Sequence, residues 1–332
     1  MAQAQIIVEN LSKTYRVPQR QGGMRAALKS LTHKDYSDIP AVADVSFSIS
    51  AGEMVGFIGP NGAGKTTTLK MLAGLLHPSG GAAQVAGFTP WQRDPDFLRR
   101  ISMVLGNKSQ MMWDIPPLDT FRVLGEIYHV PPTDLQRTID ELSELLKMSD
   151  ILTKPVRNLS LGERMKCELV ASLLHKPAVM FLDEPTLGLD VSMQRRLRQF
   201  IAETNRRTGA TIMLTSHYMA DVAELCPRVI LIHQGRLLYD GLLQTLSAEL
   251  APFKLIRLTV DQENGLDGLR EIVSGETAVL DQQNGSITLR VPRQETSAIT
   301  ARLLNALPII DLSVENPPLD AVIDQIYQEG LS

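Results

Sequence analysis

A glycine-rich segment between residues 59 and 67 constrains the fold of this 332-residue chain more than any other feature. It follows the apolar run Met54–Ile58, which reads as a buried strand, and it opens a helical pattern. Its residues are Gly59, Pro60, Asn61, Gly62, Ala63, Gly64, Lys65, Thr66 and Thr67. They match the phosphate-loop pattern GxxxxGK[ST] in the strand–loop–helix context that this pattern requires. The segment therefore predicts a site for nucleotide phosphates, with a purely structural glycine turn as the alternative.

The residue types of this loop suit a phosphate ligand. Glycines allow the backbone N–H groups to curl around phosphate oxygens without Cβ clashes, and the following helix presents the positive end of its dipole. Lys65 is suited to the β- and γ-phosphates, and the Thr66 hydroxyl is suited to Mg²⁺. We therefore expect ATP and Mg²⁺ as cofactors.

Two carboxylates end the apolar run Val179–Leu182, which has the composition of a strand buried on both faces. We expect Asp183 to hold Mg²⁺, directly or through water. Glu184 would accept a hydrogen bond from the attacking water and orient or deprotonate it. The alternative is a solvated acidic pair at the end of a strand.

Strand and helix patterns alternate from Ala51 to about Leu246, which predicts an α/β core with a mainly parallel sheet. A helical region is expected at about 107–176. The remaining strands of this core are expected at Ile101–Leu105, Thr211–Thr215 and Val229–His233, and two N-terminal segments, 5–17 and Ala41–Ser50, alternate like antiparallel strands.

The pattern changes near residue 247, and we expect a separate α+β domain at 247–332. Its expected elements are a strand (Leu255–Val260), a helix (Leu266–Val273), a hairpin turning at Asn284-Gly285, a helix (Ala298–Leu307) and a final strand and helix. No His or Cys occurs in this part, which argues for dimer contact or regulation rather than chemistry.

Composition limits the partners and the compartment. The net charge of −4 gives no global basic field, so we expect no nucleic acid partner. Cys167 and Cys226 are too few for a disulfide framework, which fits a reducing cytosol. The N-terminus lacks the pattern of a signal peptide, and no apolar stretch approaches the roughly 20 residues of a spanning helix.

A basic insertion at about 18–40 separates the first two strands. The stretch from Lys13 to Lys34 carries six basic residues and no acidic one. Met24, Leu28 and Leu31 recur at helical spacing, with Arg25 and Lys29 on another face. Two interpretations stay open: a solvated surface helix, or a basic amphipathic helix at residues 18–34 that contacts anionic headgroups or a membrane partner.

The segment Leu159–Arg164 resembles the signature sequence of ATP-binding-cassette (ABC) ATPases. Ser160 is a natural N-cap of the helix that follows, and Gly162 permits close backbone approach. Leu161 and Glu163 stand where Gly and Gln are commonest in that family. The resemblance implies an ABC ATPase core, composed of a RecA-like mixed sheet, an antiparallel β subdomain and a helical subdomain. It also implies that Ser160, Gly162 and Glu163 contact the γ-phosphate of ATP held by the opposite subunit of a homodimer.

Further matches follow in the order of this family, over about residues 5–245. Asp190 lies in a segment that resembles the D-loop, His217 resembles the switch histidine, and Tyr15 falls where an adenine-stacking aromatic is placed, with a strand-packing Tyr as the alternative. The family usually has a Gln at the end of the strand before the helical subdomain. By register Asn107 takes that place, with Gln110 three residues further on, and which of the two senses the metal stays open.

The C-terminal part, especially Asp311–Asp320, is similar to the appendage of ABC-2-type exporter ATPases. The insertion before Ala41 and the run Lys108–Asp114 resemble a multidrug- or viologen-exporter-like subgroup of these proteins. This resemblance implies a motor subunit that is peripheral at the cytoplasmic face of the inner (plasma) membrane and drives separate ABC-2-type permease subunits. The expected permease contact lies near Gln110–Asp119, where Met111, Met112 and Trp113 form an apolar cluster. The alternative for the cluster is packing inside the helical subdomain. The alternative function is a regulatory, non-transport ABC ATPase whose C-terminal domain binds a partner.

Overall fold

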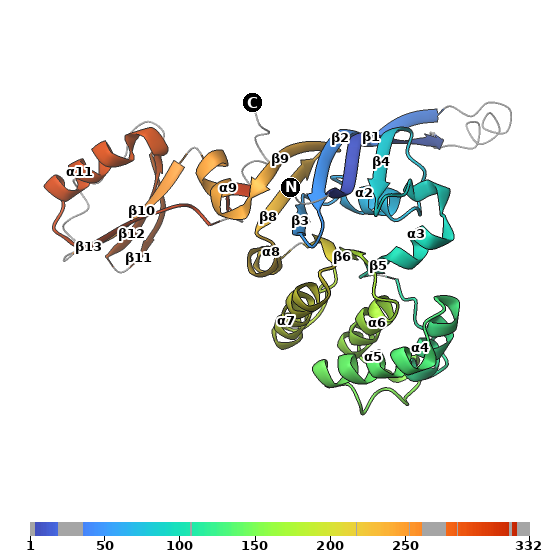
Figure 1. Ribbon diagram of the computed structural model, residues 1–332. Helices are drawn as coiled ribbons and strands as arrows, with labels where there is room; N and C mark the ends of the chain where they lie inside the picture. Colours follow the sequence, from blue (N-terminus) through green and yellow to red (C-terminus); the bar gives the residue numbers. More distant parts are fainter. Residues whose placement is uncertain are drawn as a thin grey trace, which may run out of the picture. The chain divides into compact units, whose positions relative to one another are not determined.

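The computed structural model describes two compact units (Figure 1), Met1–Asp240 and Gly241–Ser332. Within them the described residues are 4–18, 36–106, 108–216, 218–251, 253–260, 277–283, 285–318 and 321–323. The predicted helices within 18–34 and at Leu266–Val273, and the turn residue Asn284, lie outside these ranges.

A six-stranded sheet forms the centre of the first unit, with the strand order β5-β6-β7-β3-β8-β9. The pairs β5–β6, β6–β7, β3–β7 and β3–β8 are parallel. Three strands, β3, β6 and β7, are buried along their whole length, as their apolar runs predict. The bounds are β3 Met54–Ile58, β5 Ile101–Leu105, β6 Val179–Asp183, β7 Thr211–Thr215, β8 Arg228–His233 and β9 Arg236–Leu242. Gln234 and Gly235, both at positive φ, form the two-residue turn between β8 and β9.

Helices connect these strands, as a parallel sheet requires. The longest, α7, begins at the N-cap Asp190 and ends at Gly209, whose φ of 67° suits a left-handed C-cap. The bounds are α2 Lys65–Leu72, α3 Pro95–Arg100, α7 Val191–Thr208 and α8 Met219–Leu225, with a short 3₁₀ turn, η1, at Pro90–Gln92.

A second, antiparallel sheet has the order β2-β1-β4. Its strands are β1 Ala4–Pro18, β2 Tyr36–Ser50 and β4 Gly80–Val85. The hairpin of β1 and β2 is longer than predicted, because Tyr36 still pairs with Pro18. Buried side chains of both sheets form one core, in which the rings of Phe47 and Phe57 lie 6.0 Å apart between their centroids.

Three helices form the predicted helical subdomain, grouped below the sheets in Figure 1. They are α4 Pro117–Ile127, α5 Pro132–Leu145 and α6 Leu161–Leu173, with the 3₁₀ turn η2 at Val156–Asn158. Both α4 and α5 start at a proline, whose fixed φ suits the first turn of a helix.

The second unit holds a four-stranded antiparallel sheet with the order β11-β12-β10-β13. Helix α11 packs on one face, where Ile299 and Leu303 meet the buried side chains Ile256, Leu258 and Leu289. The bounds are α9 Leu243–Leu250, β10 Phe253–Val260, β11 Ala278–Gln283, β12 Ser286–Pro292, η4 Arg293–Glu295, α11 Thr296–Ala306 and β13 Ile309–Glu315.

The predicted fold class is confirmed: a mixed α/β core with an antiparallel β subdomain, a helical subdomain and a small C-terminal α+β part. Among the described residues, no helix combines the length and the apolar character needed to span a bilayer.

Candidate functional site

The phosphate loop lies between β3 and α2 and depends on backbone that only glycine fits. A Cβ on Gly59 would stand 2.3 Å from the carbonyl oxygen of Ile232, so β8 closes the loop from behind. Gly64, the N-cap of α2, has a φ of 105°. Gly62 has a φ of 80° and faces open space, because a Cβ there would meet nothing within 4 Å. The loop therefore has one side packed against the sheet and one side open to a ligand.

Lys65 is buried inside this loop, with 5% of its surface exposed. Its Nζ donates hydrogen bonds to the carbonyl oxygens of Gly59 at 2.6 Å and Pro60 at 3.1 Å. Burial lowers the pKa of the lysine, while the nearby carboxylates of Glu184 and Asp183 oppose that shift. Phosphate oxygens are stronger acceptors for an ammonium than these carbonyls, so the side chain already lies where an anion can take over its hydrogen bonds.

The carboxylate of Asp183, the last residue of β6, accepts hydrogen bonds from two threonine hydroxyls. Thr66 Oγ1 donates to its Oδ2 at 2.8 Å, and Thr215 Oγ1, at the end of β7, donates to its Oδ1 at 2.7 Å. The carboxylate is 8% exposed. Mg²⁺ prefers hard oxygen ligands such as a carboxylate and a hydroxyl, and it keeps several waters and phosphate oxygens as well. Thr66 and Asp183 together fit that requirement.

Glu184 follows in a left-handed conformation, with a φ of 54°. Its N–H donates to both the carbonyl oxygen and the hydroxyl of Thr215, each at 3.1 Å. On the other side Gly106, after β5, donates its N–H to the carbonyl oxygen of Asp183 at 2.8 Å, and a Cβ there would stand 2.6 Å from the carbonyl oxygen of Glu184. A glutamate at positive φ is a strained conformation that its surroundings enforce. Here the flanking ends of β5 and β7 enforce it.

Ser160 and Glu163 form a capping box at the start of α6. The carboxylate of Glu163 accepts hydrogen bonds from the N–H and the hydroxyl of Ser160, both at 2.8 Å, and the Glu163 N–H donates to the Ser160 hydroxyl at 3.3 Å. These hydrogen bonds from Ser160 lower the pKa of Glu163. Gly162 lies against α7, because a Cβ there would stand 3.2 Å from Cε of Met193.

Asp190 is the N-cap of α7, where its carboxylate accepts from the Met193 N–H at 3.0 Å and the Ser192 hydroxyl at 2.7 Å. Tyr15 lies on β1 with 39% of its surface exposed, and the ammonium of Lys13 lies 5.6 Å from its ring centroid. The ring is thus a surface group rather than a core side chain.

Two predicted site residues, Asn107 and His217, lie outside the described residues. The side-chain amide of Gln110 donates to the carbonyl oxygen of Glu168 on α6 at 3.3 Å. The expected apolar cluster is divided, because Met111 is buried at 6% exposure whereas Met112 and Trp113 are 42% and 50% exposed. The alternative, that the cluster packs inside the subdomain, therefore agrees with the burial of Met111 alone.

Three polar residues that the sequence analysis did not single out make buried hydrogen bonds in this region. Thr215 donates to Asp183, Glu168 accepts from the Gln110 N–H, and Asp221 accepts from the hydroxyls of Thr186 and Ser216. The sequence could have indicated Thr215 as a site residue, because it is a hydroxyl residue at the carboxyl end of a buried parallel strand, where ligands bind in α/β sheets. Glu168 and Asp221 lie within helices at positions that no sequence pattern marks, and their roles follow from tertiary contacts.

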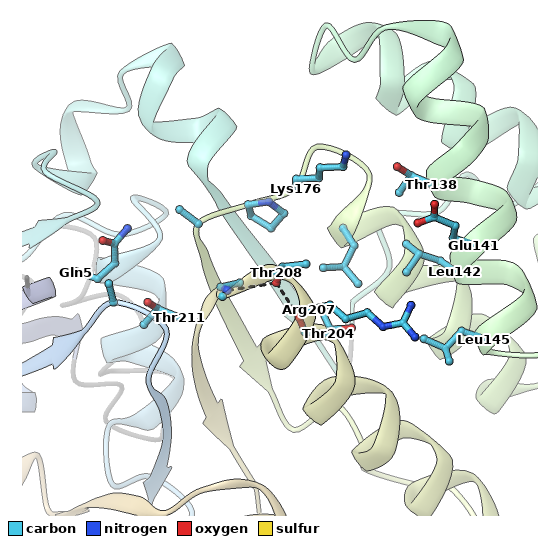
Figure 2. Close-up of a pocket in the computed structure, with 16 residues that line it drawn as sticks. Gln5, Thr138, Glu141, Leu142, Leu145, Lys176, Thr204, Arg207, Thr208 and Thr211 are labelled. Atoms are coloured by element: carbon cyan, nitrogen blue, oxygen red, sulfur yellow. Dashed lines mark hydrogen bonds between the residues drawn. The ribbon is translucent and has the colours of Figure 1, made fainter. Parts of the chain in front are cut away.

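A hollow of about 670 Å³ lies away from the phosphate loop (Figure 2). It is lined by Thr138, Glu141 and Leu142 of α5, by Arg207 near the end of α7, and by Thr211 at the start of β7. Asp183 and Thr215 stand at the opposite ends of β6 and β7. This hollow is therefore separate from the site described above.

Comparisons with known proteins identify the family. Residues 42–187 match the family model described as ABC transporter, and residues 252–315 match the model described as EvrA-like ABC transporter, C-terminal domain. The ABC transporter ATP-binding protein NatA of Bacillus subtilis is 36% identical over 208 residues, which cover 63% of this chain and 84% of NatA. The chain belongs to the ABC transporter ATP-binding proteins. It is an ATP-binding and ATP-hydrolysing subunit of a transporter, as the motifs predicted.

Other ABC proteins are similar over much of the chain. The Nod factor export ATP-binding protein I of Cupriavidus pinatubonensis is 31% identical over 271 residues, which cover 80% of this chain and 76% of that protein. Among solved structures, the ATP-binding cassette MJ0796, a dimer in a post-hydrolysis state bound to ADP and Pi, has a TM-score of 0.60. It is 20% identical, with 72% of this chain and 98% of that chain covered, and it shows the fold.

Proposed function

We propose that this ABC ATPase is the motor of an ABC-2-type exporter and that it drives separate permease subunits from the cytoplasmic face of the inner membrane. The similarity to the Nod factor export ATP-binding protein I supports the export direction. The match of residues 252–315 to the EvrA-like ABC transporter C-terminal domain supports a role in a transporter. The single observation that carries the catalytic part is the convergence of Thr66, Asp183, Thr215 and Glu184 beside the phosphate loop.

In the proposed reaction, the open side of the phosphate loop receives the phosphates of ATP. Lys65 exchanges its hydrogen bonds with Gly59 and Pro60 for phosphate oxygens. Thr66 and Asp183 would hold Mg²⁺, which would neutralise charge on the phosphates. Glu184 orients or deprotonates the attacking water. The resemblance assigns His217 to the γ-phosphate and either Asn107 or Gln110 to sensing the metal.

Hydrolysis is proposed to need two copies of the chain. Ser160, Gly162 and Glu163 of one copy would contact the γ-phosphate held by the other, and the helix start supplies N–H groups for that anion. Asp190 would lie at the contact between copies, and Tyr15 would stack on the adenine. The dimeric state of MJ0796 in its ADP- and Pi-bound form supports this arrangement. Closing and opening of the dimer would move the permease.

The permease contact is proposed at a groove of about 430 Å³ on the first unit, which includes Gln110. Its wall carries apolar side chains, two of which, Leu75 and Ile127, are 54% and 60% exposed, together with the cations of Arg93 and Arg99. Exposed apolar side chains in a groove fit the apolar face of a short partner helix, and the arginines would attract its carboxylates. The exposed Trp113 belongs to the loop that follows Gln110.

Replacing Glu184 by Gln tests the catalytic proposal, because the amide keeps the shape of the side chain but cannot accept a proton. We expect ATP turnover to fall by about a hundredfold or more, while ATP binding stays normal and ATP produces a stable dimer in size-exclusion chromatography. Glu126→Gln, on the exposed side of α4, is the matched control and should hydrolyse ATP like the parent. Normal turnover in Glu184→Gln would refute the role of Glu184.

Purification from detergent-solubilised membranes tests the exporter proposal. An affinity-tagged chain, expressed in its native host, should retain a polytopic membrane protein that is identified by mass spectrometry. A catalytically active chain that brings down no membrane protein would favour the regulatory, non-transport alternative instead.

A further inference from the structure

The loop that follows β5 is hydrogen-bonded to one buried carboxylate of helix α6. Glu168, 5% exposed, accepts hydrogen bonds from three consecutive residues of the loop. The donors are the hydroxyl of Ser109, the N–H of Gln110 at 3.1 Å and the N–H of Met111 at 3.4 Å. The carbonyl oxygen of Glu168 also accepts from the side-chain amide of Gln110 at 3.3 Å.

A second contact lies one turn earlier on the same face of α6, since side chains four residues apart are neighbours on a helix. The guanidinium of Arg164 lies 5.1 Å from the ring centroid of Trp113. The carbonyl oxygen of Trp113 accepts from the N–H of Arg157 at 3.0 Å. Residues 109–113 therefore contact α6 at Arg164 and Glu168, and Arg164 lies one helical turn after Ser160.

Packing alone does not explain a carboxylate at position 168. Its helix neighbours Met165, Leu169 and Val170 are buried apolar side chains, and an apolar residue of similar size would fill the site without the cost of burying a charge. That cost is visible as a raised pKa of Glu168, which burial causes and which the hydrogen bonds from the loop oppose. The carboxylate adds several directed hydrogen bonds between the loop and the helix, so the two cannot move independently.

We propose that Glu168 is a positioning residue that makes residues 109–113 and helix α6 one mechanical unit. This inference rests on the proposed function, since the loop borders the groove assigned to the permease. A displacement of the loop by the permease then moves Ser160 and Gly162 at the start of α6. In the opposite direction, engagement of Ser160 and Gly162 with ATP on the second copy moves the loop and Trp113.

Trp113 provides a reporter, because Trp91 is the only other tryptophan of the chain. The experiment uses the full-length chain with Trp91→Phe and Glu184→Gln, so that added Mg-ATP binds without turnover. In this background we expect ATP to change the fluorescence of Trp113 and its quenching by acrylamide. Adding Glu168→Ala should reduce that change by about fivefold or more, although ATP affinity and the ATP-induced dimer persist.

Two further variants separate coupling from loss of stability. Glu168→Gln keeps an oxygen that accepts from the loop N–H groups, so it should retain most of the Trp113 response. Glu144→Ala, on the exposed side of α5, is the matched control and should respond like the background. In hydrogen exchange, the amides of Gln110 and Met111 should exchange about tenfold faster or more in Glu168→Ala, since they lose a charged acceptor.

The results that overturn the inference are distinct from those that overturn the proposed function. A full Trp113 response in Glu168→Ala, or unchanged exchange of the Gln110 and Met111 amides, refutes the coupling by Glu168. Absence of any ATP-induced dimer in the background chain refutes the proposed ATP-bound dimer. If the Trp113 fluorescence response is lost equally in Glu168→Gln and Glu168→Ala, and both variants are folded, the proposal that the side-chain oxygen couples the loop by accepting its N–H groups is refuted.

Discussion

Replacing Asp221 by Ala is expected to destabilise the first unit and to slow ATP hydrolysis. The Asp221 side chain is 1% exposed, and its Oδ1 lies 2.8 Å from Nη1 of Arg198, which is 9% exposed. Its Oδ2 accepts hydrogen bonds from the hydroxyls of Ser216, at 2.7 Å, and Thr186. One carboxylate thus joins α7, α8 and the segments that follow β6 and β7.

The expected loss of stability follows from the buried charge of Arg198, which the substitution leaves without its Asp221 partner. Removing one partner of a buried ion pair costs about 3–5 kcal/mol, because the other charge stays buried. Arg198 keeps Glu224 as a second partner, whose side chain is 45% exposed, so we expect the lower end, about 3 kcal/mol. For a folding unit of this size that loss corresponds to a fall of about 6–12 °C in Tm.

The catalytic effect has a separate cause. Thr186 lies two residues after Glu184, and Ser216 directly precedes His217, so the loss of their common acceptor releases both segments. Misplacement of a catalytic group by about 1 Å can cost about a hundredfold in rate. We expect ATP turnover to fall by about tenfold to a hundredfold, measured at a temperature where the variant is folded.

Thermal unfolding followed by circular dichroism and a coupled ATPase assay test this prediction. Glu224→Ala is the matched control: it removes the more exposed partner of Arg198 and should cost no more than about 1 kcal/mol. Asp221→Asn keeps an oxygen for the two hydroxyls and should retain more activity than Asp221→Ala. An unchanged Tm together with normal turnover in Asp221→Ala would show that the network does not hold these segments.

Three further perturbations have expected outcomes. Burial raises the pKa of Cys167 and of Cys226 to about 12, so both thiols should react with iodoacetamide in the folded chain far more slowly than in urea, which mass spectrometry can follow. Gly59→Ala places a Cβ 2.3 Å from the carbonyl oxygen of Ile232, so we expect the loop to shift and ATP affinity, measured by calorimetry, to fall, whereas Gly209→Ala should bind ATP normally. Hydrogen bonds from Ser160 lower the pKa of Glu163, so the capping box stabilises the fold at pH values above the ordinary carboxyl pKa and loses this contribution as the pH falls through the lowered pKa. We therefore expect Glu163→Ala to lower the free energy of unfolding in urea by about 1 kcal/mol at pH 7 and by less at pH 3.

The sequence predicted those parts of the fold and site that depend on local patterns. The apolar runs that became β3 and β7 have the predicted bounds, because a strand buried on both faces leaves a continuous apolar signature. The edge strand β5, which is partly exposed, also has its predicted bounds. The glycines of the phosphate loop and the acids after Val179–Leu182 were likewise visible as motifs. The order of these motifs resembled that of the ABC family, and the comparisons showed that the chain belongs to it.

Features that depend on tertiary pairing were not predictable in this way. The hairpin of β1 and β2 extends to Pro18 and Tyr36, because cross-strand pairing continues beyond the alternating apolar pattern. The burial of Met111 depends on its neighbours in the subdomain, and the sequence left its two interpretations open. Gln110 bonds to α6 at a residue 58 positions away in the chain, so no local pattern could assign its partner.

The proposed catalytic site is bordered by two buried carboxylates that belong to none of the recognised motifs, Glu168 and Asp221. Strands β5, β6 and β7 are adjacent in the sheet, and the segments that follow them carry or adjoin the proposed catalytic residues. Glu168 holds the segment after β5, and Asp221 holds those after β6 and β7 through Thr186 and Ser216. In the proposed function the motif residues supply the chemistry, whereas two buried acids on α6 and α8 hold the three adjacent loops through hydrogen bonds. Substitutions at Glu168 and Asp221 should therefore affect different steps, the first the coupling to a partner and the second the hydrolysis itself.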